Sequence, residues 1–495
     1  MTLTSIRYLS KKRWQLIVVA VFTSAVAGCA VGPDFQRPDS PHADSYTRTP
    51  IGATTSASAL GQEIQNFEWG GKLTDQWWRA FGSPSLNHLV DEALNHNPTA
   101  ESAAATLRQA QELATAQRAS LFPSIQANYS ASRQKNPIGT ISPTLTSGDP
   151  LYTLHTAQLA IGYSPDVFGG NRRLTESLTA QAELQSHQLR AARLTLAANV
   201  VTAAVQESSL REQVAALAQI VSLSNQSLSL IRKQGDLGYA SGLDVAAQET
   251  AVAQAELSVP PMVKQLEQTR DLLALLEGRP PAQGDALTEK LDELRLPSTL
   301  PVSLPSTLVQ NRPDVRAAEA QVHTASAQLG IAMANRLPQF SISGAYGGTA
   351  NRFRDMFLDP NRFWGILGSI TQPVFDFGNL LHLKMASEAA LDAAKAQYRG
   401  VVLSAFTNVA DSLYAIDADA NLLVAAKKAE TAATKYLALS KKQLELGFVS
   451  SLMLINAEQA FRQAQLTRIQ AQAARLTDTA ALYQALGGGI KAVND

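Results

Sequence analysis

The sequence predicts a mainly helical chain that also carries four transmembrane β-strands, and three observations lead to this class. The N-terminus has the order of a secretory signal and ends at the only cysteine of the chain. The rest of the chain repeats one series of sequence landmarks, which indicates a tandem duplication. Each copy places two alternating segments of about ten residues, the length of a tilted membrane strand, before a very long helix.

Composition disfavours several classes of protein. The 495 residues include 42 basic and 42 acidic side chains, so the net charge gives no general case for nucleic-acid binding. One cysteine cannot form an internal disulfide, and no cluster of Cys and His has the density of a structural zinc site. No apolar run reaches the roughly 18 residues that a membrane-spanning helix needs. With only 17% charged residues, the chain is too apolar for disorder, and a soluble cytosolic enzyme is disfavoured.

Residues 1–28 are predicted to be a signal peptide. Basic residues precede an apolar stretch, and small residues then lead to Val26-Ala27-Gly28-Cys29. This end resembles a bacterial lipobox, which implies cleavage before Cys29, a diacylglycerol on its sulfur and a palmitoyl chain on its amine. Ala30 in place of aspartate implies sorting to the outer membrane. The alternative is an ordinary signal peptide in which the cysteine is coincidental.

The remaining chain contains one pattern twice. Asn97-Pro98 recurs as Arg312-Pro313, 215 residues later, and the Gly-x-x-Ser of 238–241 recurs at 447–450, 209 residues later. Several further matches keep this register, which chance does not easily produce. We therefore divide the chain into a lipidated N-terminal segment with an equatorial region, repeat 1, an equatorial linker, repeat 2 and a tail, at residues 29–93, 94–278, 279–308, 309–486 and 487–495.

Each repeat is predicted to contain the same elements in the same order. A proline at the first helical position starts a helix, two alternating strands follow, and a long helix then turns back as a return helix. Repeat 1 should have them at residues 98–122, 124–133, 154–163, 171–234 and 243–277. Repeat 2 should have them at residues 313–337, 339–348, 363–371, 379–446, with Gly400 as the only break, and 452–486. Pro260-Pro261 should kink the first return helix.

The first long helix has the spacing of a coiled coil. Residues 171–234 contain no Gly and no Pro, and 64 helical residues extend about 95 Å at 1.5 Å each. A 4-3 spacing predicts a contact seam formed by Leu210, Val214, Leu217, Val221, Ser224, Leu228 and Ile231.

Four strands cannot close a membrane barrel, and open strand edges cannot face lipid. The chain must therefore share its sheet with copies of itself. An eight-stranded dimer would have an interior filled by side chains, whereas a twelve-stranded trimer leaves a lumen. A small, polar inward face would suit water, namely Ser124, Gln126, Asn128 and Ser130. A small soluble sheet is the alternative for one such strand, but four strands of matched length after a lipoprotein signal favour the membrane.

The pattern resembles the TolC-like outer membrane efflux proteins, most closely the lipid-anchored OprM/NodT branch. The resemblance covers the mature chain, and it is carried by Trp77-Trp78, Asn95-His96-Asn97-Pro98, Arg312-Pro313-Asp314-Val315-Arg316 and Gln372–Gly378. It implies a homotrimer whose outer membrane β-barrel continues as a periplasmic α-helical barrel. It also implies docking to a periplasmic adaptor (membrane fusion) protein and an inner-membrane transporter, most often of the RND type.

The function implied is that of a passive exit duct in a tripartite efflux pump for drugs or other small molecules. A duct for type I protein secretion has the same fold and stays open as an alternative. A lipid-anchored coiled-coil protein without a pore would have no use for four strands, and a hydrolase would need a nucleophile with its base. No catalytic, cofactor-binding or metal-ligating constellation is seen. Gly487-Gly488-Gly489 lacks a following Lys-Ser/Thr, so it predicts a flexible tail and not a phosphate loop.

Two sets of candidate functional residues lie at the turns between long and return helices. Adaptor docking is expected at the tips, at Gly238, Ser241, Gly447 and Ser450, which could also be plain helix caps. In the family, carboxylates after this turn narrow the closed end and bind cations. Here the second copy has Met453 and Asn456, so we expect an apolar gate from Leu452 or Met453 and one acidic ring from Asp244. The alternative is that Asp244 only caps its helix.

Overall fold

The computed structural model describes residues 30–41, 43–49, 51, 64–71, 73–135 and 151–489. The signal peptide and Cys29, with its predicted lipidation, lie outside these residues. The chain forms two compact units, one within residues 1–38, 108–184 and 318–397, the other within 39–107, 185–317 and 398–495. Each unit takes segments from both repeats, so the duplicated halves do not fold as separate domains.

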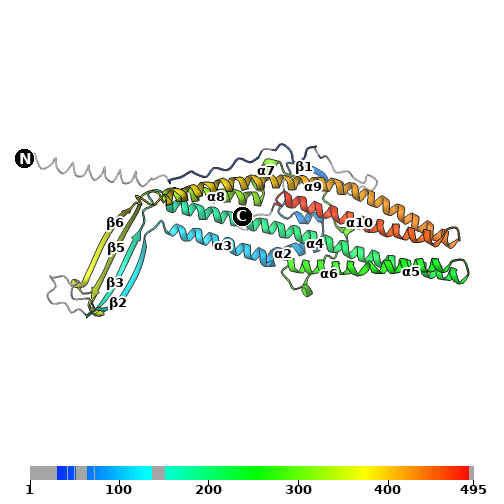
Figure 1. The fold of residues 1–495 in the computed structure, drawn as a ribbon, viewed down its shortest axis with the longest axis horizontal. Helices are drawn as coiled ribbons and strands as arrows, with labels where there is room; N and C mark the ends of the chain where they lie inside the picture. The colour runs from blue at the N-terminus through cyan, green and yellow to red at the C-terminus, as the bar shows by residue number, and fades with distance from the viewer. Residues whose placement is uncertain are drawn as a thin grey trace, which may run out of the picture. The chain divides into compact units, whose positions relative to one another are not determined.

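The order of the elements follows the duplication (Figure 1). The first half contains β1 (Asn66–Trp69), η1 (Trp77–Phe81), α2 (Pro84–His96), α3 (Pro98–Ala119), β2 (Ser124–Lys135), β3 (Leu151–Tyr163), α4 (Gly170–Asp236), α5 (Gly242–Leu257) and α6 (Val259–Leu276). The linker carries η3 (Pro281–Gln283), η4 (Leu291–Glu293) and β4 (Thr299–Val302). The second half contains α7 (Pro305–Asn311), α8 (Pro313–Ala334), β5 (Gln339–Ala350), η5 (Phe353–Asp355), η6 (Asp359–Asn361), β6 (Arg362–Thr371), α9 (Asn379–Glu445) and α10 (Ser451–Ala485).

The strands β2, β3, β5 and β6 and the helices α4 and α9 end within three residues of the limits expected from the sequence. The helices α3 and α8 end three residues earlier than expected, because the chain tightens into a turn after each of them. Phe122 N donates to the carbonyl of Ala119 at 3.1 Å, and Leu337 N to that of Ala334 at 3.0 Å. Gly400 does not break α9, since the helix continues through it.

The kink expected in the first return helix is present. Ser258 separates α5 from α6, and Pro260-Pro261 follow in the first turn of α6, where proline costs little because those N–H groups have no helical partner. The second return helix, α10, runs unbroken over 35 residues.

We call the unit within residues 39–107, 185–317 and 398–495 the helical unit. One backbone contact of this unit occurs in both repeats but is made by different side chains. Asn97 Nδ2 donates to the carbonyl of Leu276, the last residue of α6, at 2.8 Å. At the equivalent position of repeat 2, Arg312 Nη1 donates to the carbonyl of Ala485, the last residue of α10, at 2.7 Å. Both bonds join the residue before a proline-started helix to the end of the return helix. In each repeat, one side chain therefore joins the start of the first helix to the end of the return helix.

The predicted seam of α4 is confirmed at Leu210, Leu217, Ser224, Leu228 and Ile231, which are buried, and is wrong at two positions. Val214 and Val221 are only half-buried, whereas Gln213 and Ile220, one residue earlier in each case, are buried. A second buried 4-3 series shares three residues with the predicted seam and adds Gln213, Ile220 and Ser227: Gln213, Leu217, Ile220, Ser224, Ser227 and Ile231. Gln470 Nε2 of α10 donates to Gln213 Oε1 at 3.1 Å. The seam is thus partly held by hydrogen bonds.

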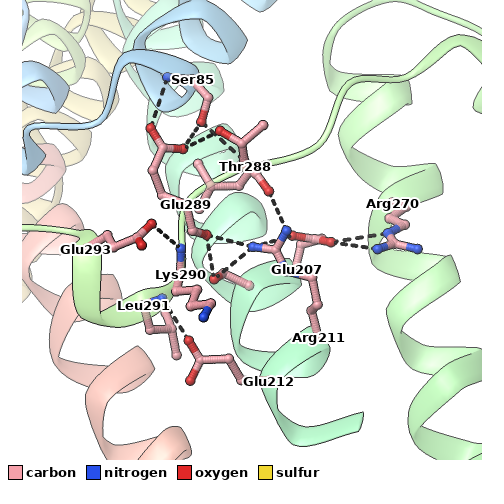
Figure 2. Close-up of polar contacts among 12 residues, drawn as sticks. Ser85, Glu207, Arg211, Glu212, Arg270, Thr288, Glu289, Lys290, Leu291 and Glu293 are labelled. Carbon is pink, nitrogen blue, oxygen red and sulfur yellow. Dashed lines mark hydrogen bonds and ion pairs between the residues drawn. The ribbon is translucent and has the colours of Figure 1, made fainter. Parts of the chain in front are cut away.

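The linker is fastened to α4 by polar contacts (Figure 2). Arg211 donates to the carbonyl oxygens of Leu287 at 2.7 Å and Glu289 at 2.6 Å. Leu291 N donates to Glu212 Oε1 at 2.9 Å. These bonds satisfy backbone groups in a segment with little regular structure of its own.

The side chain of Glu289 continues this attachment to the start of α2. Its carboxylate accepts from Ser83 Oγ at 2.8 Å and also from Ser85. Burial opposes ionisation, but the hydrogen bonds from Ser85 and Ser83 outweigh it and lower the pKa of Glu289 to about 2. The linker and the equatorial region also share a parallel pair of strands, β1 with β4, which the sequence did not predict.

The equatorial region supplies aromatic core residues to the helical unit. Trp77 is fully buried, stacks on Tyr483 of α10 with 5.2 Å between ring centroids, and contacts Phe81 edge-on. Trp78 is 2% exposed, so both tryptophans belong to the core.

The prediction of a flexible glycine tail is wrong for the residues that the structure describes. Gly487 and Gly488 are buried, and Gly488 has a φ of +61°. A Cβ at Gly488 would lie 2.0 Å from Leu194 Cδ1, so the glycine permits close packing against α4.

Among the described helices, α4 alone has the length and composition that would allow it to cross a membrane, with a mean hydropathy of 1.4 over 18 residues. The helix completely buries Val200, Val201 and Val205 in the helical unit. Of this apolar stretch, 39% is buried, so packing within the described chain accounts for part of its apolar character.

Two carboxyl groups meet inside the helical unit. Asp419 of α9 and Asp478 of α10 are hydrogen-bonded to each other beside Arg475, whose side chain is 1% exposed. Burial raises the pKa of Asp419 to about 7, and the like charge of Asp478 acts in the same direction.

We expect the helical unit to lose stability as the pH rises from about 4 to about 7. Over that range the unfolded chain releases the Asp419 proton while the folded chain retains it, so the folded state binds more protons. Asp478→Asn should flatten this dependence and gain about 1–3 kcal/mol at pH 8 after allowance for solvent screening. Thermal unfolding of both proteins at pH 5 and pH 8 measures the effect. An equal pH dependence in the two proteins would contradict it.

Candidate functional site

The four strands form one antiparallel sheet, in the order β2-β3-β5-β6, with two chemically different faces. On one face, Ile125 lies opposite Ile161 and Phe340 opposite Ile370. The opposite face is small and polar and includes the predicted lumen residues Ser124, Gln126, Asn128 and Ser130, together with Ser341 and Ser369, whose hydroxyls lie 2.7 Å apart. The alternation along each strand thus separates an apolar from a polar surface.

The sheet has two edges. Within the part of the chain that the structure describes, β2 and β6 each pair on one side only. All twelve residues of β2 are exposed, and β6 exposes Trp364 by 75% and Ile366 by 77%. An apolar strand with an unpaired edge is unstable in water and in lipid alike, so this sheet is built to be continued.

The first tip joins α4 to α5. Gly238 has a φ of +80°, and Tyr239 N donates back to the carbonyl of Gln234 at 2.8 Å, which is the geometry of a glycine C-cap. Ser241 then caps α5 in a capping box: Asp244 N donates to Ser241 Oγ at 3.3 Å, and Ser241 N to Asp244 Oδ2 at 2.9 Å.

The second tip joins α9 to α10 and repeats the C-cap but not the capping box. Gly447 has a φ of +77°, and Phe448 N donates to the carbonyl of Gln443 at 2.9 Å. Ser450 makes no side-chain capping bond, and Met453, at the position of Asp244 in the first copy, has no carboxylate to accept from the backbone N–H of Ser450.

Asp244 also connects the two tips. Ser451 Oγ, at the start of α10, donates to Asp244 Oδ1 at 2.6 Å. The hydrogen bonds from Ser241, from Ser451 and from the Ser241 backbone lower the pKa of Asp244 to about 2, against slight desolvation. The carboxylate is therefore ionised at any physiological pH, and it does cap its helix, as the alternative interpretation proposed. Its place in an acidic ring stays a prediction.

Apolar side chains are exposed at both tips in equivalent positions. In the first copy Leu237, Tyr239 and Leu243 are 72%, 84% and 80% exposed. Their equivalents Leu446, Phe448 and Leu452 are 60%, 77% and 59% exposed. We call these six residues the tip patch. A monomer gains nothing from exposing the same apolar set twice, so the tip patch indicates a contact surface.

The other predicted gate residues also lie at the surface of this chain. Met453 is 41% exposed, with its sulfur 3.0 Å from the hydroxyl of Tyr436, and Asn456 is exposed.

A buried carboxylate near the tips was missed by the sequence analysis. Glu458 of α10 is 7% exposed, and it accepts hydrogen bonds from Ser224 at 3.1 Å, from Ser227, and from Gln248 Nε2 at 3.4 Å. Its equivalent Glu249 is instead exposed and pairs with Arg232. Only the polar residues at seam positions of α4, read together with Glu458, could have indicated this cluster. The cluster joins α4, α5 and α10 through hydrogen bonds to Glu458. Removing one of these donors would leave a buried carboxylate with one hydrogen bond fewer, which is costly.

Within the described residues, no group of three or more His, Cys, Asp or Glu could hold a metal ion.

Comparisons with known proteins give the family. The model of the family described as outer membrane efflux protein matches residues 89–279 and 304–488. The two matches begin 215 residues apart and end 209 residues apart, which are the shifts found within the sequence. The duplication is therefore a property of the family.

Relatives match over most of their length. The pyoverdine export outer membrane protein OpmQ of Pseudomonas putida is 31% identical over 85% of this chain and 89% of its own. The outer membrane protein OprJ of Pseudomonas aeruginosa is 28% identical, covering 94% of both chains.

Solved structures agree with the sequence relatives. The outer-membrane channel OprN superposes with a TM-score of 0.82 at 27% identity, over 93% of this chain and 99% of its own. The channel MtrE of Neisseria gonorrhoeae, at 24% identity and a TM-score of 0.80, shows the same fold. The interpretation of the chain as a structural lipoprotein without a pore is therefore wrong. The chain belongs to the outer membrane efflux protein family and is an outer membrane efflux channel with the TolC-like fold.

Proposed function

We propose that three copies of the chain form a passive duct in a tripartite pump, which exports drugs or other small molecules across the outer membrane. A periplasmic adaptor protein and an inner-membrane transporter, of the RND type, would supply cargo and energy. The observation that carries this proposal is the tip patch, which presents the same three apolar side chains at two equivalent turns.

The sheet supports the trimer. Each copy offers four strands with one free edge on β2 and one on β6, so β6 of one copy can pair with β2 of the next. Twelve strands leave a lumen, and the small polar face would line it while the apolar face contacts lipid.

The tip patch supports docking of an adaptor. The exposed apolar side chains of the tip patch other than Leu452, which is assigned to the aperture, would give the adaptor a ring of anchoring points around a threefold axis. The glycine caps at Gly238 and Gly447, and the capping box of Ser241, fix the shape of the turns that carry them. Ser450 would contribute through its place in the second turn.

The lipid anchor on Cys29 is part of the proposal. The first described residues are fixed to the unit that contains the strands, since Val31 N donates to the carbonyl of Phe168 at 3.0 Å. A lipid on Cys29 would therefore start close to the ends of the membrane strands, where a bilayer can receive it.

The proposed aperture lies at the same end as the tips. Leu452 and Met453 would close it by apolar contact between copies, with Asn456 as the polar residue one turn later. Asp244 would add one carboxylate per copy, and three converging like charges would attract a cation.

We expect the detergent-solubilised mature protein to contain three chains per particle. A monomer would leave two strand edges unpaired, at several kcal/mol for each backbone group in lipid. Light scattering corrected for bound detergent gives the mass, and a monodisperse monomer would refute the shared barrel.

Charges in the tip patch should abolish export. Tyr239→Glu with Phe448→Glu should weaken adaptor binding by about 2 kcal/mol or more, as for other buried interface anchors. Drug resistance and dye efflux, in cells that lack other outer membrane channels, measure export. Tyr239→Phe with Phe448→Tyr exchanges the side chains of the two copies and should retain it. Normal export by the double glutamate variant, at wild-type trimer levels, would contradict docking at this surface.

Asp244→Asn should relieve block of the channel by multivalent cations, because the ring charge is lost. It should also cost about 0.5–1 kcal/mol of stability through the weaker cap. Ser451→Ala is the matched control, since it removes the bond between the tips and keeps the charge. Single-channel conductance with added cation is the measurement. Unchanged block in Asp244→Asn would leave Asp244 with a capping role alone.

A further inference from the structure

A hollow of about 750 Å³ lies against the sheet beside the start of α4. Its size is within the roughly 300–1,000 Å³ of pockets that bury small ligands. Most of its lining is apolar and comes from three strands and the segments that flank them: Leu121, Tyr163, Val167, Phe340, Ile342 and Ile370. Tyr163 pairs with Ile342 and Phe340 with Ile370, so these four residues belong to the apolar face of the sheet. The hollow therefore opens on the face that is expected to contact lipid.

The rim of the hollow is polar on one side. Arg172 and Asp166 line it there and form an ion pair at 3.2 Å. Asp166 also accepts from the backbone N–H of Asn171 and of Arg172, both at 2.9 Å, and so caps α4. The hollow thus has an apolar floor and a charged edge, the polarity of a site for an amphiphile.

The N-terminal segment begins at this rim. Val31 N donates to the carbonyl of Phe168, whose ring centroid lies 6.2 Å from that of Phe340 in the lining. A Cβ on Gly169, which has a φ of +78°, would lie 2.6 Å from Ala30, so only glycine allows this approach. Cys29 is bonded directly to Ala30, within about 3.8 Å between Cα atoms.

Residues 31–35 are held in place by hydrogen bonds and a ring contact. Arg173, 3% exposed, donates to the carbonyl of Val31 at 3.3 Å, to that of Gly32 at 3.2 Å and to Asp34 at 2.7 Å. Farther along, Phe35 stacks on His323 with 4.3 Å between centroids. A tether that served only to reach the membrane would need none of these contacts. They fix the described residues that follow Cys29 in the chain.

We propose that the hollow seats one acyl chain of the lipid on Cys29. The inference rests on the proposed lipid anchor and goes beyond it, because it assigns the lipid a protein site. Bilayer tails are as apolar as the hollow, so the gain comes from packing and not from leaving water. A seated chain fixes the sheet against the lipid and fills a gap that loose tails would pack poorly.

A photo-cross-linking experiment on the full mature protein tests the seat. Phe340→p-benzoylphenylalanine places a photoreactive ring in the lining, and the protein is irradiated in its native membrane. Mass spectrometry then identifies the attached molecule, and intact mass reports whether Cys29 carries lipid. We expect a cross-link between residue 340 and the N-terminal lipopeptide of the same chain.

Two glycines of β6 give a matched pair of variants. Gly368 lines the hollow, whereas Gly365 pairs with Ala345 on the opposite face, and an added Cβ meets nothing within 4 Å at either. Gly368→Leu should fill the hollow and abolish the lipopeptide cross-link, whereas Gly365→Leu should leave it.

The outcomes separate the proposals. Cross-links to free phospholipid alone, with lipid present on Cys29, overturn the seat and leave the anchor intact. An intact mass without lipid overturns the anchor and the seat together, but not the efflux function, which resistance assays measure independently. A lipopeptide cross-link that persists in Gly368→Leu also overturns the seat.

Discussion

A backbone group in hydrocarbon must have a hydrogen-bond partner, and this constraint organises the whole chain. In the sheet β2-β3-β5-β6 the inner strands have hydrogen-bond partners on both sides, whereas β2 and β6 each have a partner on one side only. A chain with four strands can be stable in a membrane only by pairing its edge strands with those of other chains. The alternation, clean in β2 and looser in the other strands, then separates a lipid face from a water face. The assembly that we propose follows from this requirement.

The two repeats keep the same elements and backbone contacts, but the side chains at equivalent positions have diverged. The backbone contact that closes each repeat is kept, although Asn97 makes it in one copy and Arg312 in the other. The acidic position after the tip is Asp244 in the first copy and Met453 in the second, and the first serves both turns through Ser451. Glu249 lies in solvent while its equivalent Glu458 is buried. A trimer of such a chain has six similar but unequal tips.

Prediction from sequence worked where a local period decides the structure. Strand limits followed from alternation, helix starts from proline at the first position, and the break before α6 from Pro260-Pro261. It failed where packing decides. The predicted seam of α4 included Val214 and Val221 and left out Gln213 and Ser227, because Gln213 and Ser227 are polar, and only Gln470 and Glu458 on α10 explain why they are buried. The hydrogen bonds from Arg211 to two carbonyl groups of the linker correspond to no periodic pattern in the sequence.

The sequence by itself determined the four strands, the long helices and the two tips, because each depends on residues close together in the chain, and it determined the duplication because the same local patterns recur 209 to 215 residues later. Only the tertiary structure decided which face of α4 is buried, that Asp244 caps its own helix and joins the tips, and that the N-terminal segment ends beside a hollow on the sheet. Apart from the local cap of Asp244, these features join residues that are tens to hundreds of positions apart. Their bonds arise from how helices and strands pack, and a one-dimensional pattern does not record that packing.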